Sequence, residues 1–120
     1  MIADEIYEHI NYVGKHESIA QFPGMKERTI IVNGISKAYA MTGWRIGYIA
    51  APEWIVKGCN KLQGQYTSGS CSISQRAAIA AYTQSQACVE EMRQAFQRRR
   101  DLIVKLAKDN YLRLRSNCCL

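Results

Sequence analysis

The feature that most constrains the fold of this chain is a continuous β-branched run at residues 29–33, Thr-Ile-Ile-Val-Asn. An apolar run of this length, without alternation between apolar and polar residues, is typical of a strand that is buried on both faces. Such strands occur in parallel sheets that helices cover, so the run predicts an α/β fold. With 120 residues, the chain forms one domain at most.

The predicted strand leads into a loop with an unusual set of polar groups. Lys37 stands beside Ser36 and eight residues before Arg45, among small and apolar neighbours. Burying an ammonium group is costly unless it is paired or loses its proton, and a neutral lysine amine forms Schiff bases with carbonyls. The planar guanidinium of Arg45 suits a phosphate, and the Ser36 hydroxyl adds a donor. Together these groups suit an aldehyde that also carries a phosphate.

A second interpretation of this loop needs no ligand. The same residues could form a buried strand, turn and strand whose lysine reaches solvent and whose arginine pairs with an acid. The start of the chain bears on this choice, because apolar residues 1–3 are followed at once by Asp4. That pattern predicts the end of a buried parallel strand, and ligands of open α/β sheets bind at the carboxyl edge of such strands.

These motifs closely resemble the class I/II aminotransferases that depend on pyridoxal phosphate, in their fold-type I, aspartate aminotransferase-like form. The family motif is a Ser-Lys pair, a short apolar loop and Gly-x-Arg-x-Gly-Tyr. Here it reads Ser36-Lys37 followed by Gly-Trp-Arg-Ile-Gly-Tyr at residues 43–48. The family also has an upstream Asp-x-x-Tyr, which Asp4 and Tyr7 match. The resemblance implies an internal fragment of the large, cofactor-binding domain, with about three strands of its central sheet and flanking helices.

The resemblance also implies a role for each of these residues. Lys37 would be catalytic and would hold the cofactor, pyridoxal 5'-phosphate, as a Schiff base. Asp4 would keep the ring nitrogen protonated, and Tyr7 would donate to the phenolic oxygen of the ring. Ser36 and Arg45 would hold the phosphate. The implied reaction transfers an amino group between an amino acid, aspartate or a similar one, and a 2-oxo acid, in a homodimer. Other fold-type I chemistries, such as those of lyases and synthases, remain open.

The remaining residues predict loops, a strand and helices. Residues 8–28 are polar and are interrupted by glycine and proline, which predicts a connecting loop. Residues 44–51 predict the next strand, which would place Lys37 and Arg45 at neighbouring positions of the sheet. Helices are predicted from Pro52 to Gly64, from Ser72 or Ser74 to Tyr82, and over residues 86–108.

The resemblance divides the chain into three parts. Residues 1–85 correspond to the C-terminal half of the large domain, and residues 86–109 correspond to a long helix that leads to a small domain. Residues 110–120 do not follow the family pattern, and our hypothesis is a truncated reading frame with a shifted or foreign tail. So short a piece leaves a strand edge open and buries little surface, so we expect marginal stability and self-association.

Cysteine usage and hydropathy limit the other classes of function. No Cys-x-x-Cys pair occurs, so we expect reduced thiols and predict neither disulfides nor a metal site. No apolar run is long enough to span a membrane, and the N-terminus lacks a signal pattern, which favours a cytoplasmic protein without a membrane partner. The five cysteines are Cys59, Cys71, Cys88, Cys118 and Cys119.

The net charge of +6 is concentrated towards the C-terminal end of the chain. Residues 86–120 carry eight Lys/Arg against four Asp/Glu, including the run Arg98-Arg99-Arg100. No aromatic residues for base stacking are interleaved with this run, so we interpret it as a solvated helix face and predict no nucleic-acid partner. The alternative to an enzyme is a non-catalytic chain, either a relic or a basic interaction module formed by residues 86–115.

Overall fold

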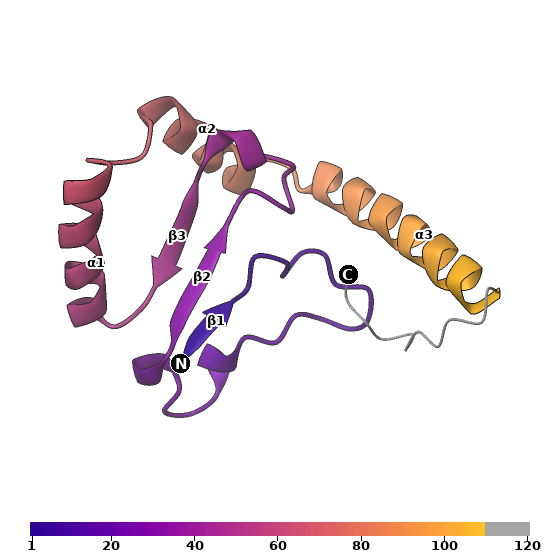
Figure 1. The fold of residues 1–120 in the computed structure, drawn as a ribbon, viewed down its shortest axis with the longest axis horizontal. Coiled ribbons are helices and arrows are strands. Elements are labelled where there is room, and N and C mark those ends of the chain that lie inside the picture. The colour runs from indigo at the N-terminus through magenta and orange to yellow at the C-terminus, as the bar shows by residue number, and fades with distance from the viewer. Residues whose placement is uncertain (110–120) are drawn as a thin grey trace.

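The computed structural model describes residues 1–109, in which three strands form one sheet and three α-helices follow it (Figure 1). Residues 110–120 lie outside the described residues, and with them the predicted shifted or foreign tail, the end of the alternative basic module, and Cys118 and Cys119. The strands are β1 (Ile2–Asp4), β2 (Ile30–Gly34) and β3 (Gly47–Ala50), in that order across the sheet. The α/β fold class predicted from the β-branched run is confirmed.

Strand pairing brings three chain segments to one edge of the sheet. β1 runs parallel to β2, with Asp4 opposite Val32. β3 runs antiparallel to β2, with Gly34 opposite Gly47. The carboxyl ends of β1 and β2 and the beginning of β3 therefore lie at the same edge, which we call the carboxyl edge. Gly34 is required there, because a Cβ at this residue would lie 2.8 Å from the backbone oxygen of Ile46.

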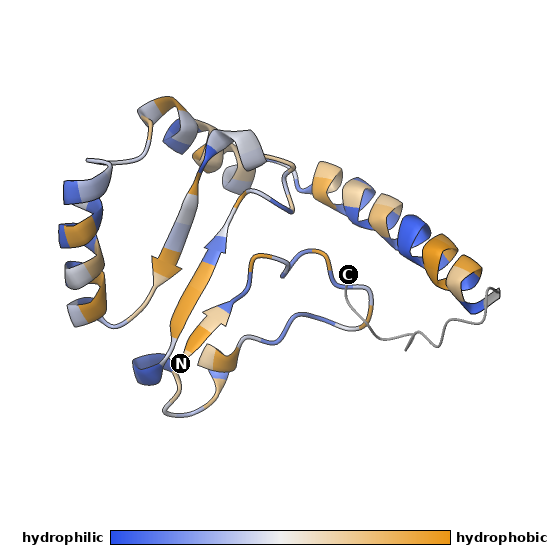
Figure 2. Ribbon diagram, viewed as in Figure 1, coloured by the Kyte–Doolittle hydropathy of each residue, from blue (hydrophilic) through white to orange (hydrophobic). Residues whose placement is uncertain are grey.

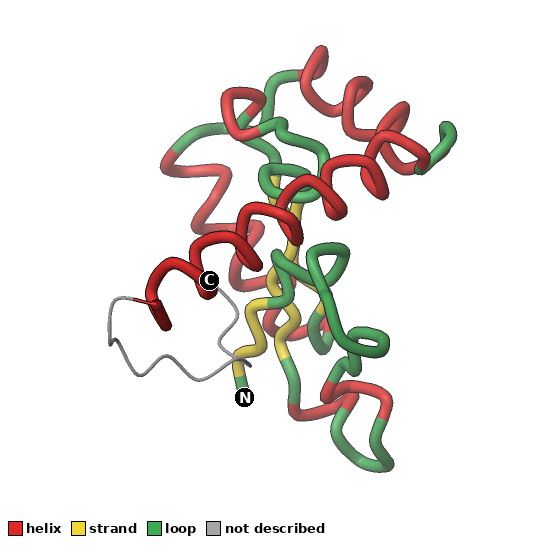
Figure 3. The backbone as a smooth tube through the Cα atoms, turned by 90° about the vertical axis from the view of Figure 1, so that its right-hand side faces the viewer, coloured by secondary structure: helices red, strands yellow, loops and turns green. Residues whose placement is uncertain are grey.

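The helices follow the sheet in sequence, and the last one leaves it. In Figure 1, α1 stands beside the sheet, α2 lies near the carboxyl edge and α3 projects away from the sheet. In the view of Figure 3, turned by 90°, a long helix passes in front of the strands. The radius of gyration is 17.5 Å, whereas a compact domain of this length has about 13 Å. Their bounds are α1 (Glu53–Tyr66), α2 (Ser72–Thr83) and α3 (Ala87–Asp109), with short 3₁₀ turns at Ile19–Gln21, Lys26–Arg28 and Thr42–Trp44.

The prediction of a strand over residues 44–51 is wrong at its beginning. Thr42–Trp44 forms a 3₁₀ turn, and the backbone N–H of Arg45 donates to the carbonyl of Thr42 at 3.3 Å. Arg45 has a φ of 54°, in the left-handed region, so the chain turns before β3 begins at Gly47. Lys37 and Arg45 therefore do not occupy neighbouring sheet positions. Both lie in the connection between β2 and β3.

The most buried apolar side chains lie beneath the lysine loop. Ile35 and Ala38, on either side of Lys37, are 0% and 3% exposed. α2 contributes Ala78 to the core, and the first turns of α3 contribute Val89. Because burial of apolar area is the main stabilising contribution, Ile35 and Ala38 help to hold the backbone around Lys37 in place.

Much apolar surface remains exposed, and we expect it to cause self-association. Trp54 and Leu62, both on α1, are 75% and 62% exposed, and exposed apolar patches of this kind favour association. Figure 2 shows apolar residues interspersed with polar ones along α1. Size-exclusion chromatography with light scattering should show species larger than a monomer, and Trp54→Gln combined with Leu62→Gln should shift them towards the monomer. A monomer with a sharp, reversible thermal transition would contradict this expectation. No helix among residues 1–109 combines the length and apolar character that crossing a membrane requires.

Candidate functional site

All five residues predicted to form the site come to the carboxyl edge. Asp4 is the last residue of β1, and Tyr7 lies in the turn that follows it. Ser36 and Lys37 follow the end of β2, and Arg45 precedes the beginning of β3. Residues that are up to 41 positions apart are thus placed together by parallel pairing of β1 with β2 and antiparallel pairing of β2 with β3.

The structure brings Lys37 and Tyr7 into direct contact. The Lys37 Nζ lies 5.7 Å from the centre of the Tyr7 ring, a cation–π distance. Both side chains are exposed, and within residues 1–109 the Lys37 amine has no hydrogen bond or ion pair. The amine is therefore accessible to a ligand, and the phenol of Tyr7 lies beside it.

Ser36 and Arg45 are linked through Thr42. The Thr42 Oγ1 donates to the carbonyl of Ser36 at 3.0 Å, and the Thr42 carbonyl accepts from Arg45 Nη1 at 2.8 Å. Among the described residues the Ser36 hydroxyl has no hydrogen-bond partner. The same is true of Nε and Nη2 of Arg45. A guanidinium has five N–H donors, so Arg45 keeps most of its capacity to bind an anion.

Asp4 organises the turn that leads to Tyr7. Its Oδ1 accepts from the backbone N–H of Ile6 at 3.1 Å, which stabilises the turn after β1. Its carboxylate is exposed, and across residues 1–109 no hydrogen bond, ion pair or ring contact joins Asp4 to Lys37 or Arg45. The shared edge, rather than contact between the side chains, relates these three groups.

A buried polar network holds this turn against the loop that follows it. Glu5, only 8% exposed, accepts from the Ser18 hydroxyl at 2.7 Å and lies 3.1 Å from His16 Nε2. Glu8 accepts from the buried amide of Asn33 at 2.9 Å, which ties the turn to β2. His16 therefore has a structural role as a partner of the Glu5 carboxylate. A buried carboxylate needs such partners. An acid expected to be buried after β1 was therefore the sequence signal that could have pointed to Ser18 and His16.

An aromatic cluster forms the wall between the lysine loop and α2. The ring of Tyr39 lies 5.4 Å from that of Tyr82, edge to face, and Tyr48 lies 6.3 Å from Tyr82. The Tyr39 hydroxyl donates to Gln86, between α2 and α3, at 2.8 Å. Burial raises the pKa of both Tyr39 and Tyr82 above the ordinary value of 10, so both hydroxyls stay protonated at neutral pH.

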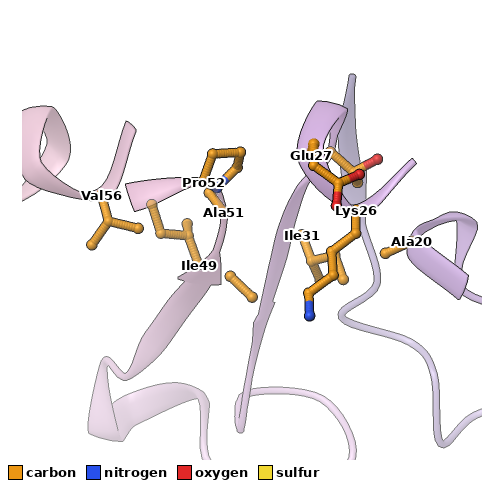
Figure 4. Close-up of a pocket in the computed structure, with 10 residues that line it drawn as sticks. Ala20, Lys26, Glu27, Ile31, Ile49, Ala51, Pro52 and Val56 are labelled. Carbon is orange, nitrogen blue, oxygen red and sulfur yellow. The ribbon is translucent and has the colours of Figure 1, made fainter. Parts of the chain in front are cut away.

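Two cavities lie elsewhere, and neither is lined by the five predicted site residues. The larger, of about 710 Å³, opens near the beginning of β2 and the end of β3, away from the carboxyl edge (Figure 4). It is lined by Ile31, Ile49, Pro52 and Val56 among others. The smaller, of about 420 Å³, lies beside His16 and Arg93. Among the described residues, the candidate site lies along an edge where four of its five residues are exposed.

The basic face of α3 is occupied in part by contacts within the chain. Arg93 pairs with Glu90 at 2.8 Å. Arg100 pairs with Asp101 at 2.7 Å and stacks over the Tyr12 ring, 4.5 Å from its centre. Arg93 and Arg100 are thus partly covered by contacts within the chain, whereas Arg98 and Arg99 are exposed.

The Glu90–Arg93 pair gives α3 a small acid sensitivity. Hydrogen bonds from Arg93 and then Gln94 lower the pKa of Glu90 from its ordinary 4.5 to about 2. Because the pKa of Glu90 is lower in the folded chain than in the unfolded one, the charged carboxylate stabilises the folded chain fully above about pH 4.5. This stabilisation is lost as the pH falls towards 2. Thermal unfolding followed by circular dichroism should show a small loss between these values that Glu90→Gln removes. Equal loss in both proteins would contradict the prediction.

Comparison with known proteins shows the family of this chain. The aminotransferase class I and II family matches residues 1–117, which includes most of the tail. The bifunctional aspartate aminotransferase and glutamate/aspartate-prephenate aminotransferase of Petunia hybrida is 54% identical over 109 residues, 88% of this chain and 23% of that protein. The aspartate aminotransferase of Geobacillus stearothermophilus is 51% identical over 105 residues, 86% of this chain and 27% of that protein.

Solved structures show the same relationship. The aromatic aminotransferase of Pyrococcus horikoshii superposes with a TM-score of 0.87 at 45% identity, over 90% of this chain and 30% of that one. The aspartate aminotransferase of Rhizobium meliloti gives 0.83 at 49% identity, over 87% of this chain and 26% of that one. The fold is part of the fold-type I α/β fold of these enzymes.

The chain therefore belongs to the class I and II aminotransferases, a family of enzymes that depend on pyridoxal phosphate. It spans about a quarter of the length of the curated relatives that it matches.

Proposed function

We propose that this chain forms the cofactor-holding part of a transaminase that moves an amino group between an amino acid, aspartate or a similar one, and a 2-oxo acid. The observation that supports this most strongly is the set of polar groups with unused hydrogen-bonding capacity at the carboxyl edge. An amine, a hydroxyl, a guanidinium, a phenol and a carboxylate lie along this edge, which three neighbouring strands form. The relatives named above are aminotransferases of aspartate and aromatic substrates.

The chemistry of this donor set fits pyridoxal phosphate. A neutral lysine amine bonds to an aldehyde, and a guanidinium with a neighbouring hydroxyl binds a phosphate. When bound, the cofactor supplies an aldehyde carbon that carries the amino group and a ring that withdraws electrons. Lys37 is the residue that holds the aldehyde, and Ser36 and Arg45 hold the phosphate.

The other two residues would act on the ring. The Asp4 carboxylate would keep a proton on the ring nitrogen, since an opposite charge favours the protonated form. The Tyr7 hydroxyl would donate to the ring oxygen. The Lys37 amine would move the proton of the substrate α-carbon as a general base and acid. Its contact with Tyr7 keeps the amine and the phenol on the same side of the edge.

The arrangement of the complete protein is part of the same proposal. Residues 1–85 belong to the large domain, and α3 leads from it towards a small domain, which fits the way α3 projects from the sheet. The exposed apolar side chains of α1 suit a homodimer. The free thiols of Cys59, Cys71 and Cys88 suit the reducing cytoplasm.

A chimera tests this function with a complete active site. The matching 105 residues of the Geobacillus stearothermophilus aspartate aminotransferase would be replaced by those of this chain. We expect the chimera to transfer the amino group of aspartate to 2-oxoglutarate. A folded, cofactor-loaded chimera without transfer to any 2-oxo acid would refute the proposal, and the unaltered parent enzyme is the control.

A further inference from the structure

The connection between β2 and β3 is held in a strained conformation. Two residues in it that are not glycine have positive φ angles, Ala40 at 53° and Arg45 at 54°. Side chains at such angles are unfavourable, so the conformation persists only where surrounding contacts impose it. The contacts that impose it in this connection are therefore informative about the site.

Thr42 makes contacts to both halves of the connection. Its side-chain hydroxyl donates to the Ser36 carbonyl at 3.0 Å. Its own carbonyl accepts from Arg45 twice, from Nη1 at 2.8 Å and from the backbone N–H at 3.3 Å. One residue thus joins the peptide group that precedes Lys37 to the guanidinium of Arg45.

This geometry fixes the relative position of the two anchors. The Ser36 carbonyl belongs to the peptide plane shared with Lys37, so the bond from Thr42 restricts rotation of that plane. The bond to Nη1 holds one arm of the Arg45 guanidinium and leaves Nε and Nη2 without a partner among residues 1–109. A planar guanidinium held at one nitrogen is prepared to bind an anion through the others.

We propose that Thr42 is a positioning residue that sets the spacing between the lysine and the phosphate-binding arginine, without touching the cofactor itself. This inference rests on the proposed function for its consequence, but its structural part concerns the protein alone. Thr42 does not belong to the predicted site, and neither cavity includes it.

The test compares three versions of the full 120-residue chain: wild type, Thr42→Val, which removes the hydroxyl at similar shape, and Thr42→Ser, which keeps it. Affinities for pyridoxal phosphate and for pyridoxal, which lacks the phosphate, are measured by fluorescence titration. A hydrogen bond of ordinary strength predicts about 3- to 10-fold weaker binding of pyridoxal phosphate by Thr42→Val. Pyridoxal affinity should not change, and Thr42→Ser should match wild type.

A purely structural role predicts a different result. In that case Thr42→Val would lower the thermal midpoint and weaken both ligands equally, which would overturn the inference. Should Thr42→Val fail to fold, Thr42→Ser decides, because a changed affinity ratio in a protein that keeps the hydroxyl would also overturn it.

Amide hydrogen exchange at Arg45 separates this inference from the proposed function. Thr42→Val should speed exchange of the Arg45 amide even without cofactor, because the acceptor carbonyl is no longer held in place. If wild type binds neither ligand while this exchange still rises, the proposed function fails and the positioning by Thr42 stands. Unchanged exchange in Thr42→Val would overturn the inference.

Discussion

Replacement of Lys37 by alanine should lower the rate of aspartate amino transfer in the chimera by a factor of about 10²–10⁴ or more, the usual contribution of a general acid–base group. The reason is that the Lys37 amine would be both the group that holds the aldehyde and the group that moves the α-carbon proton. Lys37→Arg should be equally inactive, because a guanidinium keeps its charge and cannot act as a base. Steady-state kinetics with matched cofactor loading would measure the effect.

The matched control for Lys37 is Lys57. Lys57 is an exposed lysine of α1 that pairs with Glu53 at 2.7 Å, away from the carboxyl edge. Its replacement by alanine should leave the rate within about twofold of that of the unaltered chimera, because an exposed ion pair contributes little. A Lys37→Ala chimera that keeps its rate would show that another amine does the chemistry.

Arg45 is expected to act through the phosphate alone. In the 120-residue chain, Arg45→Ala should lower the affinity for pyridoxal phosphate by about 10- to 150-fold, since a hydrogen bond to a charged group contributes about 1.5–3 kcal/mol. Pyridoxal, without the phosphate, should bind as it does to wild type. Arg45→Lys should recover only part of the loss, because an ammonium cannot form the planar two-point contact.

Arg76 supplies the comparison for Arg45. Arg76 is an exposed residue of α2, outside the connection between β2 and β3. Arg76→Ala removes the same charge from the chain and should leave both affinities unchanged. Equal weakening by the two variants would mean that net positive charge, and not the placement of Arg45, attracts the phosphate.

Local patterns in the sequence were enough to predict most elements of the fold. The β-branched run before Gly34 predicted β2 because a strand buried between neighbours needs such residues. Pro52 and the apolar spacing after it predicted α1, which begins at Glu53. Both signals depend on neighbours in sequence, so they can be read without knowing the tertiary structure.

The connection between β2 and β3 was harder to predict. The apolar residues after Gly43 suggested one continuous strand, and nothing in them announces the left-handed turn at Arg45. Thr42 was missed for a similar reason, since a single threonine carries no pattern and its importance comes from what its carbonyl and hydroxyl meet. The contact of Tyr7 with Lys37 depends on the parallel pairing of β1 with β2, which is a property of the tertiary structure.

Reduction of the chain with borohydride in the presence of pyridoxal phosphate, followed by peptide mapping, tests the central claim most directly. That claim is that an amine, an acid and a guanidinium at one sheet edge surround a single phosphorylated ring. We predict that the pyridoxyl label is confined to Lys37 and that excess inorganic phosphate lowers the amount of label incorporated. A label spread evenly over Lys37, Lys57, Lys61 and Lys105 would contradict the claim.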